Sequence, residues 1–401
     1  MIRPTRRTAT EADFTRRRLA QLALLGLTDE APPAAPPAAP PGPASAATPA
    51  PPTAPSTARA STKSPPAARA HYDRARRLAA DDPVLRALVT ALTPGSGPPP
   101  PPVPTPEPVK PFDNLVLLSA GRVSATAVLT DDGIVLVDAL TSPADAEDVI
   151  IPGLRAVGAD PAAIRHVVVT HGHADHFGGA QTLADRYGAR VHMAPADWDL
   201  LTRTRPSDAP VRDLDIADGA QLTLGGTTIE LHHTPGHTPG TVSPVIPVLA
   251  GRRHHSAMLW GGLTPPSAVA ELRTFLASVH SFRAVMRRTN VEVELSNHPN
   301  DHDLERVEHL RHQPPGAANP FLLGGPRTQR YMAVMDAMLR GRIADAEAVE
   351  AAEAAGAAKA AGRGAGARVA GPGRPARDAR TGVGPSVTEA RGVSLWGHET
   401  G

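Results

Sequence analysis

Thr170-His171-Gly172-His173-Ala174-Asp175-His176 places three histidines and one aspartate within six residues. The stretch completes the β-branched, apolar segment Ile164–Thr170, which is typical of a buried strand. In an extended loop, side chains two residues apart point the same way, so the imidazoles of His171 and His173 reach one cation. The aspartate and the last histidine lie further along the loop and face a second position beside it. The cluster therefore predicts a metal site at the end of a strand.

A polar surface loop with coincidental histidines is the bland alternative. The chain has 17 histidines, and most of them fall between His166 and His312. At that frequency the pattern arises by chance in roughly one or two chains per thousand. The intervening residues Thr170, Gly172 and Ala174 are small, which keeps the loop from crowding an ion. We therefore favour the metal site.

Composition divides the chain into unequal parts. Of its 45 prolines, 24 fall between Pro32 and Pro111, and the C-terminal end is mostly Ala, Gly and Arg. Such segments bury no core and are typical of extended linkers and tails. We predict an export signal or short helix at 1–30, an Ala/Pro-rich linker at 31–110 with a short helix near 71–92, one folded domain at 111–345, and a disordered tail at 346–401.

Charge and residue usage narrow the functional classes. The chain has 41 basic and 40 acidic residues, a formal net charge of +1, and no cysteine. Balanced charge disfavours nucleic acid as a partner, and the lack of cysteine excludes thiolate catalysis and Cys-type zinc sites. No apolar run approaches the 18 or so residues of a membrane span. We expect a small-molecule substrate, and the sequence leaves the oligomeric state open.

The N-terminus carries an ambiguous signal. Consecutive arginines at Arg16-Arg17-Arg18 precede the apolar stretch Leu19–Leu27, as in a twin-arginine export signal. Ala44-Ser45-Ala46 has the form of a cleavage site. The apolar stretch is short, however, and an amphipathic helix accounts for the same residues. We favour a cytoplasmic location, with export as the alternative.

Strands and helices alternate through the domain. Val242–Leu249 contains Pro244 and Pro247, which predicts an edge strand at best because proline cannot donate to a ladder. The other predicted strands are Leu115–Ser119, Ala127–Ala139 with a turn at Asp132-Gly133, Ile164–Thr170, Arg190–Met193, Leu222–Leu224, Thr227–His232, Ser256–Trp260 and Val291–Leu295. The predicted helices are Ser142–Val157, Gly178–Tyr187, Ala268–Arg288, Leu304–His312 and Thr328–Glu350.

The His-x-His-x-Asp-His pattern, after an apolar strand and before Gly178-Gly179, resembles the signature of the metallo-β-lactamase superfamily. A second element of that family follows about sixty residues later as Thr234-Pro235-Gly236-His237-Thr238-Pro239-Gly240. The family's metal-binding histidine in this turn maps onto His237. The resemblance covers roughly 111–340 and implies an α/β fold, the four-layer αββα sandwich, with metals at one open edge.

One part of the family pattern is missing. Many members hold a bridging aspartate after a later strand, where this chain has Gly261-Gly262. The third subclass of metallo-β-lactamases lacks that carboxylate, and this chain is similar. The resemblance then implies one metal on His171, His173 and His237, and a second on Asp175, His176 and His298. His302 is an alternative to His298 by proximity.

These ligands predict a zinc hydrolase with two Zn²⁺ ions per domain. Nitrogen and oxygen ligands suit zinc, and three imidazoles leave one position open for a water whose pKa falls to about 7. By this interpretation Asp175 orients the nucleophile, which attacks the carbonyl of a cyclic amide or ester, as a β-lactamase does. The alternatives are a thioester or lactone hydrolase of the same fold, an iron-dependent oxidoreductase, a nuclease and a non-catalytic binding module.

Overall fold

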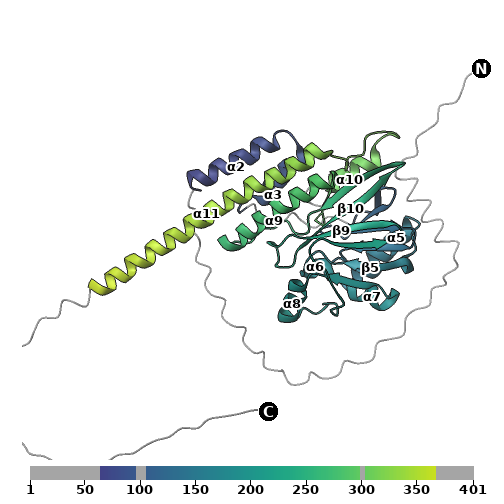
Figure 1. Cartoon of the computed structure of the whole chain (residues 1–401), viewed down its shortest axis with the longest axis horizontal. Helices are drawn as coiled ribbons and strands as arrows, with labels where there is room; N and C mark the ends of the chain where they lie inside the picture. Colours follow the sequence, from purple (N-terminus) through teal and green to yellow (C-terminus); the bar gives the residue numbers. More distant parts are fainter. Residues whose placement is uncertain (1–63, 96–104, 299–302, 367–401) are drawn as a thin grey trace, which may run out of the picture. The chain divides into compact units, whose positions relative to one another are not determined.

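Two β-sheets form the centre of the computed structural model, which describes residues 64–95, 105–298 and 303–366 (Figure 1). The first sheet has the strand order β1 (Val109–Phe112), β2 (Leu115–Ser119), β3 (Ser124–Thr130), β4 (Gly133–Val137), β5 (Ile164–Val168), β6 (Arg190–Met193) and β7 (Leu214–Asp215). The second has the order β12 (Val291–Leu295), β11 (Arg253–Leu259), β10 (Val242–Ala250), β9 (Thr227–His233) and β8 (Ala220–Leu224).

The central strands are buried on both faces, which explains why their sequences are apolar without alternation. In β2, Leu115 and Leu117 point into the cluster between the two sheets, whereas Val116 and Leu118 point into the cluster beneath the outer helices. Side chains of a strand alternate between faces, so one apolar strand serves two cores. The structure therefore has the predicted αββα layering, with one core between the sheets and one outside each sheet.

Short helices cover the outer face of the first sheet. Ser142 begins the first of them, and its side chain accepts a hydrogen bond from the amide of Asp145, as an N-cap does. These helices are α4 (Pro143–Asp145), the π-helix η1 (Ala146–Ile150), α5 (Ile151–Ala156), α7 (Ala180–Tyr187) and α8 (Pro195–Thr204), with the 3-10 turn η2 (Pro161–Ala163) and α6 (Ala174–Phe177) between them. The sequence did not predict α8.

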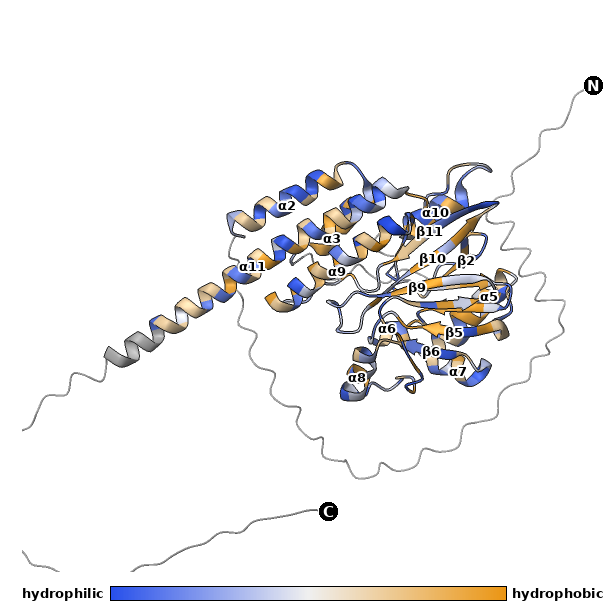
Figure 2. Cartoon of the chain, in the orientation of Figure 1, coloured by the Kyte–Doolittle hydropathy of each residue, from blue (hydrophilic) through white to orange (hydrophobic). Residues whose placement is uncertain are grey.

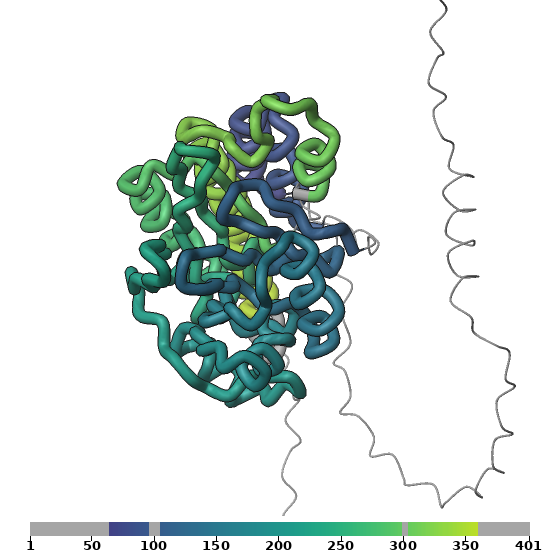
Figure 3. Tube along the Cα trace, turned by 90° about the vertical axis from the view of Figure 1, so that its right-hand side faces the viewer, coloured from purple at the N-terminus to yellow at the C-terminus, as the bar shows by residue number. Residues whose placement is uncertain are grey.

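Four helices cover the second sheet: α2 (Pro66–Ala79), α3 (Pro83–Leu92), α9 (Val269–Arg288) and α11 (Gly325–Gly366). Figure 2 shows hydrophilic and hydrophobic residues alternating along α2 and α9, as in amphipathic helices. In Figure 3 the purple segment of α2 and α3 lies beside the green-to-yellow segment of α11. The structure thus differs from the predicted linker with one helix near 71–92, because two helices are present and both join the core.

Only some of the predicted boundaries near the ends of the chain can be compared with the structure. Helix α11 continues to Gly366, past the predicted helix end at Glu350, because its Ala-rich sequence has strong helix propensity. The predictions for 1–30, 31–63 and 367–401 fall outside the described residues. Helix α10 (Asp303–His312) is present as predicted. Within the described ranges no helix is both long and apolar enough to cross a lipid bilayer.

The predicted edge position of Val242–Leu249 was wrong, because β10 is the central strand of the second sheet. Pro244 lies in the ladder with β9, opposite Leu231, and Pro247 lies in the ladder with β11, opposite Ser256. Backbone N–H groups alternate in direction along a strand, so prolines three residues apart remove donors on opposite sides. Each ladder therefore loses at most one donor to a proline, and the nine-residue strand keeps the rest.

Asp82 joins the N-terminal helices to α11. Its Oδ1 caps α3 by accepting from the amides of Val84 and Leu85, and its carboxylate pairs with Arg327 and Arg330 of α11. Burial by itself raises the pKa of Asp82, but the two guanidinium groups outweigh burial and hold that pKa below its usual value. The same side chain thus stabilises a helix end and a helix–helix contact.

We expect Asp82→Ala to lower the free energy of unfolding by ~2 kcal/mol, because it removes both a cap and a partly buried ion pair. Asp82→Asn retains the capping oxygen, so it should cost about half as much. The carboxyl has a lower pKa when folded, so its contribution is present above about pH 4 and disappears as the pH falls through the folded pKa. Urea unfolding at pH 7 and pH 3 measures both effects. Equal stability of the wild type and Asp82→Ala at pH 7 would contradict the assignment.

Candidate metal centre

The predicted site residues come from separate segments of the chain that converge in the structure. His171 and His173 follow β5, and α6 carries Asp175 and His176 immediately afterwards. His237 lies in the turn between β9 and β10, and His298 follows β12. Because β5 belongs to the first sheet and the other strands to the second, the site requires both sheets to be in place.

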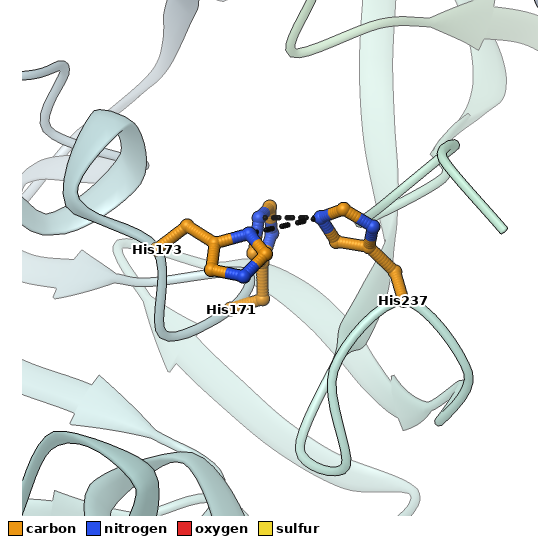
Figure 4. A group of neighbouring side chains, drawn as sticks. All are labelled: His171, His173 and His237. Atoms are coloured by element: carbon orange, nitrogen blue, oxygen red, sulfur yellow. Dashed lines mark hydrogen bonds between the residues drawn. The ribbon is translucent and has the colours of Figure 1, made fainter. Parts of the chain in front are cut away.

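His171, His173 and His237 form the first cluster, shown in Figure 4. Nε2 of His237 lies 3.1 Å from Nε2 of His171 and 3.1 Å from Nδ1 of His173. The three rings are nearly perpendicular to one another. Around a tetrahedral zinc ion, ligand nitrogens at the usual bond length lie ~3.3 Å apart. The spacing of the three nitrogens fits such an ion.

The outer nitrogens of two of these rings are tied to backbone carbonyls. Nδ1 of His171 lies 2.8 Å from the carbonyl oxygen of Gly261, and Nδ1 of His237 lies 2.8 Å from that of Thr264. A carbonyl oxygen only accepts, so both Nδ1 atoms carry the proton and both Nε2 atoms carry a lone pair. Two lone pairs facing each other at 3.1 Å repel unless an electrophile lies between them. The residues present therefore fit a shared cation.

The second cluster has the same construction. Nε2 of His176 lies 3.2 Å from Nε2 of His298, while Nδ1 of each ring faces an oxygen, that of Asp138 at 2.8 Å and the carbonyl of Arg122 at 3.2 Å. Asp175 Oδ2 lies 3.5 Å from Nε2 of His176 and 3.9 Å from that of His298. The two clusters adjoin, since the rings of His171 and His176 have centroids 4.0 Å apart.

Burial sets the protonation of the site. It lowers the pKa of His171 well below the ordinary value, and it also lowers the pKa of His173 and His298 and brings that of His237 to about 4. These four rings are therefore neutral near pH 7, as metal ligands must be. For His176 burial acts the same way, but the carboxylate of Asp138 outweighs it and raises the pKa. A cation at Nε2 of His176 would take the place of that proton.

Asp197 in α8 holds the two halves of the first cluster together. Its carboxylate is fully buried and accepts from the amide of Gly172 at 2.7 Å, the hydroxyl of Thr238 at 2.6 Å and the amide of Gly240 at 2.8 Å. Gly172 lies between His171 and His173, and Thr238 follows His237. One side chain therefore fixes both loops of the first cluster.

The position of the missing bridging aspartate has no room for a side chain. A Cβ atom at Gly261 would lie 2.0 Å from the carbonyl oxygen of Val242, and one at Gly262 would lie 2.5 Å from the ring of His237. Contacts below 3 Å force backbone or a rigid ring to move. The carbonyl of Val242 and the ring of His237 therefore leave no room for a carboxylate at these two positions. Replacing one glycine by aspartate would not by itself restore the bridging ligand.

The structure brings together every predicted site residue: His171, His173, Asp175, His176, His237 and His298. Their role as metal ligands stays a prediction, and His302 falls outside the described residues. Sequence reasoning missed three buried partners, namely Asp138, Asp197 and Asn297. Each is a polar residue next to apolar ones, at the end of a strand or the start of a helix, and that is a weak signal. The aromatic residues Trp260 and Phe275 stack in the core.

Comparison with known proteins agrees with this geometry. Residues 118–248 match the model of the metallo-beta-lactamase superfamily. Over 104 residues the chain is 39% identical to a hydroxyacylglutathione hydrolase of Anaeromyxobacter dehalogenans, covering 26% of this chain and 36% of that protein. Over 120 residues it is 35% identical to an uncharacterized protein of Mycobacterium leprae, covering 23% of this chain and 53% of the other. The chain thus spans about a third to a half of these relatives.

Solved structures show the same fold. A metallo-beta-lactamase from Legionella gormanii superposes with a TM-score of 0.51 at 19% identity, covering 60% of this chain and 96% of that one. A beta-lactamase from Chitinophaga pinensis gives a TM-score of 0.51 at 20% identity, covering 60% and 94%. The family match contains both the His171–His176 motif and His237. Residues 118–248, which carry these converging histidines, therefore form part of a metallo-beta-lactamase superfamily domain within this chain.

Proposed function

We propose that this protein is a hydrolase that uses two zinc ions to cleave a cyclic amide or ester, in the manner of a β-lactamase. The observation that carries the proposal is the convergence of ring nitrogens whose outer nitrogens are tied to oxygen acceptors. Structural zinc sites close all four positions with protein ligands, whereas three imidazoles leave one position open. The first cluster, with three histidines, has the open type.

His171, His173 and His237 would hold one ion, and Asp175, His176 and His298 the other. When bound, zinc lowers the pKa of a water molecule into the neutral range and polarises a carbonyl oxygen. The donor set consists of imidazole nitrogens and one carboxylate without sulfur, which suits zinc among the divalent ions. Carbonyl oxygens of Gly261 and Thr264 keep two of the rings in the correct tautomer.

Asp175 is the proposed catalytic residue. Burial by itself raises its pKa, but the neighbouring rings of His176 and His298 outweigh burial and lower it, so the carboxylate is ionised at neutral pH. Its side chain is 38% exposed, which leaves an oxygen accessible to water and substrate. An ionised, accessible carboxylate at this place orients an attacking water by accepting its hydrogen bond. Asp138 holds the proton on Nδ1 of His176 while this occurs.

The substrate class has two candidates with separate support. The fold shared with β-lactamases and the closed position at Gly261-Gly262 favour a cyclic amide or ester. The 39% identity with a hydroxyacylglutathione hydrolase favours a thioester instead. Either substrate presents a carbonyl carbon to the same nucleophile, so the residues named above serve both reactions.

Metal analysis combined with a substrate panel tests the proposal. The full chain, loaded separately with zinc and with iron, is incubated with a chromogenic cephalosporin, an acyl-homoserine lactone and a hydroxyacylglutathione. We expect two zinc ions per chain and turnover of the cephalosporin or the lactone. Turnover of only the thioester would move the assignment to the second candidate. Activity that appears only with iron, or a zinc-loaded protein inactive on all three compounds, would contradict the proposed hydrolase.

A further inference from the structure

Asn297 lies beneath both proposed metal positions. It follows β12, is only 2% exposed, and immediately precedes His298. Its own carbonyl oxygen accepts from the amide of Ser124, which fixes its backbone to the first sheet. The side chain points toward the ligands of both clusters and touches no proposed ion position directly. None of the reactions discussed above requires it.

The amide group of Asn297 contacts the acceptors of two different ligands. Its Nδ2 lies 3.1 Å from the carbonyl oxygen of Gly261, which accepts from His171. The same Nδ2 lies 3.2 Å from Oδ2 of Asp138, which accepts from His176. An amide nitrogen has two hydrogens, so it satisfies both acceptors at once. A further contact of 3.2 Å, to the hydroxyl of Thr170, lies between them.

We propose that Asn297 is a positioning residue that couples the two metal positions. The inference rests on the proposed two-metal function. The ring of His171 would be fixed on binding an ion, and with it the carbonyl of Gly261; the amide of Asn297 would transmit that restraint to Asp138 and His176. Occupation of one position then orients a ligand of the other. His298, the next residue, is placed by the same backbone.

The lack of room for a side chain at Gly261 and Gly262 explains why the proposed coupling runs through the amide of Asn297, which contacts the outer partners of the ligands. A bridging carboxylate couples two metals by binding both, but neither glycine accommodates a Cβ atom. In this chain the amide of Asn297 provides a link through hydrogen bonds between the outer partners. The hydrogen bond to the carboxylate of Asp138 is of the charge-assisted, stronger kind, so its loss is large enough to change an affinity measurably.

Cobalt titration of the metal-free full chain tests the coupling, because the absorption of Co²⁺ reports each site directly. We expect the wild type to take up two ions with positive cooperativity. In Asn297→Ala and in the isosteric Asn297→Leu, all six ligands remain, but the coupling should fall about tenfold, equivalent to ~1.4 kcal/mol. In the metal-free protein, both variants should also shift the Nδ1–H resonances of His171 and His176 in NMR spectra.

Asn114→Ala is the matched control. Asn114 is a buried asparagine that bonds the backbone of Pro247 and Leu249, away from the site. It should lose comparable stability and leave the titration and both resonances unchanged. Cooperative binding in both Asn297 variants, or the same loss in Asn114→Ala, would overturn the coupling. A wild type that binds fewer than two ions would overturn the two-metal proposal and the coupling with it, and the wild-type titration alone separates that case.

Discussion

His237→Ala is expected to empty the first metal position and to lower kcat/KM about a thousandfold or more on whichever substrate the protein hydrolyses. The ring of His237 lies 3.1 Å from both His171 and His173, so its loss leaves two ligands. Lewis-acid stabilisation of a developing charge is worth several kcal/mol, and ~4 kcal/mol corresponds to a factor of about a thousand. Few single substitutions outside the site can reduce activity this far without unfolding the protein.

His298→Ala provides the contrast. Nε2 of His298 faces His176, on the side of the second position, so this variant should bind one zinc ion where the wild type binds two. Metal content by mass spectrometry and cobalt spectra distinguish the two losses. The control is His233→Ala, four residues before His237. Nε2 of His233 lies 2.8 Å from the carbonyl oxygen of Ile216, and among the described contacts it reaches no proposed ligand. We expect His233→Ala to keep both ions and most of the activity.

Retention of two tightly bound ions in His237→Ala would show that the turn between β9 and β10 is not part of the metal site. Identical losses in His237→Ala and His298→Ala would mean that the ions do not occupy separate positions. Loss of metal in His233→Ala as well would indicate that the turn is merely unfolded by substitution. Each outcome can be recognised from stoichiometry before any substrate is added.

The parts of this molecule that the sequence predicts well are those in which one local segment determines the result. The apolar strand before His171 and the turn at His237 each carry their own signal, and their spacing requires only that two strand ends meet. Asp175 and His176 follow from the same segment. His298 rests on resemblance, because a lone histidine after a strand has no local pattern of its own.

The parts that the sequence predicts poorly depend on packing between distant segments. The helices α2 and α3 look like part of a linker because proline-rich segments flank them, yet α11 supplies the apolar surface that they cover. The central position of β10 depends on how its two ladders are staggered around Pro244 and Pro247. Asp197 and Asn297 have meaning only once loops from both sheets lie around them.

Asp197→Asn is expected to weaken zinc binding at the first position about a hundredfold, which is large for a residue that touches no ion. Second partners of metal ligands typically change affinity by 10- to 100-fold, and Asp197 holds two loops. All three of its partners, Gly172, Thr238 and Gly240, donate hydrogen bonds to it. An asparagine presents an NH₂ group to at least one of these donors, and a buried donor left without an acceptor costs about 1–3 kcal/mol.

The expected loss should fall mainly on the first position. The second cluster depends on Asp138 and on the carbonyl of Arg122, whereas the carboxylate of Asp197 accepts from residues beside the ligands of the first. Zinc competition with a chromophoric chelator, together with thermal unfolding with and without zinc, measures the affinity and the stability separately. We expect the first site to be weakened about a hundredfold and the second by no more than the tenfold coupling, and a smaller increase in unfolding temperature on adding zinc.

Asp199→Asn is the control, since Asp199 lies in the same helix, is exposed, and pairs only with Arg212 among the contacts that the structure describes. It should bind zinc as the wild type does. If Asp197→Asn also bound zinc like the wild type, the strands alone would fix the positions of the loops that carry His173 and His237. The close approach of Gly240 to Asp197 argues against that outcome, because a Cβ at Gly240 would lie 2.7 Å from the carboxyl carbon. The turn that carries His237 packs directly on the carboxylate of Asp197, so the position of His237 depends on this buried carboxylate.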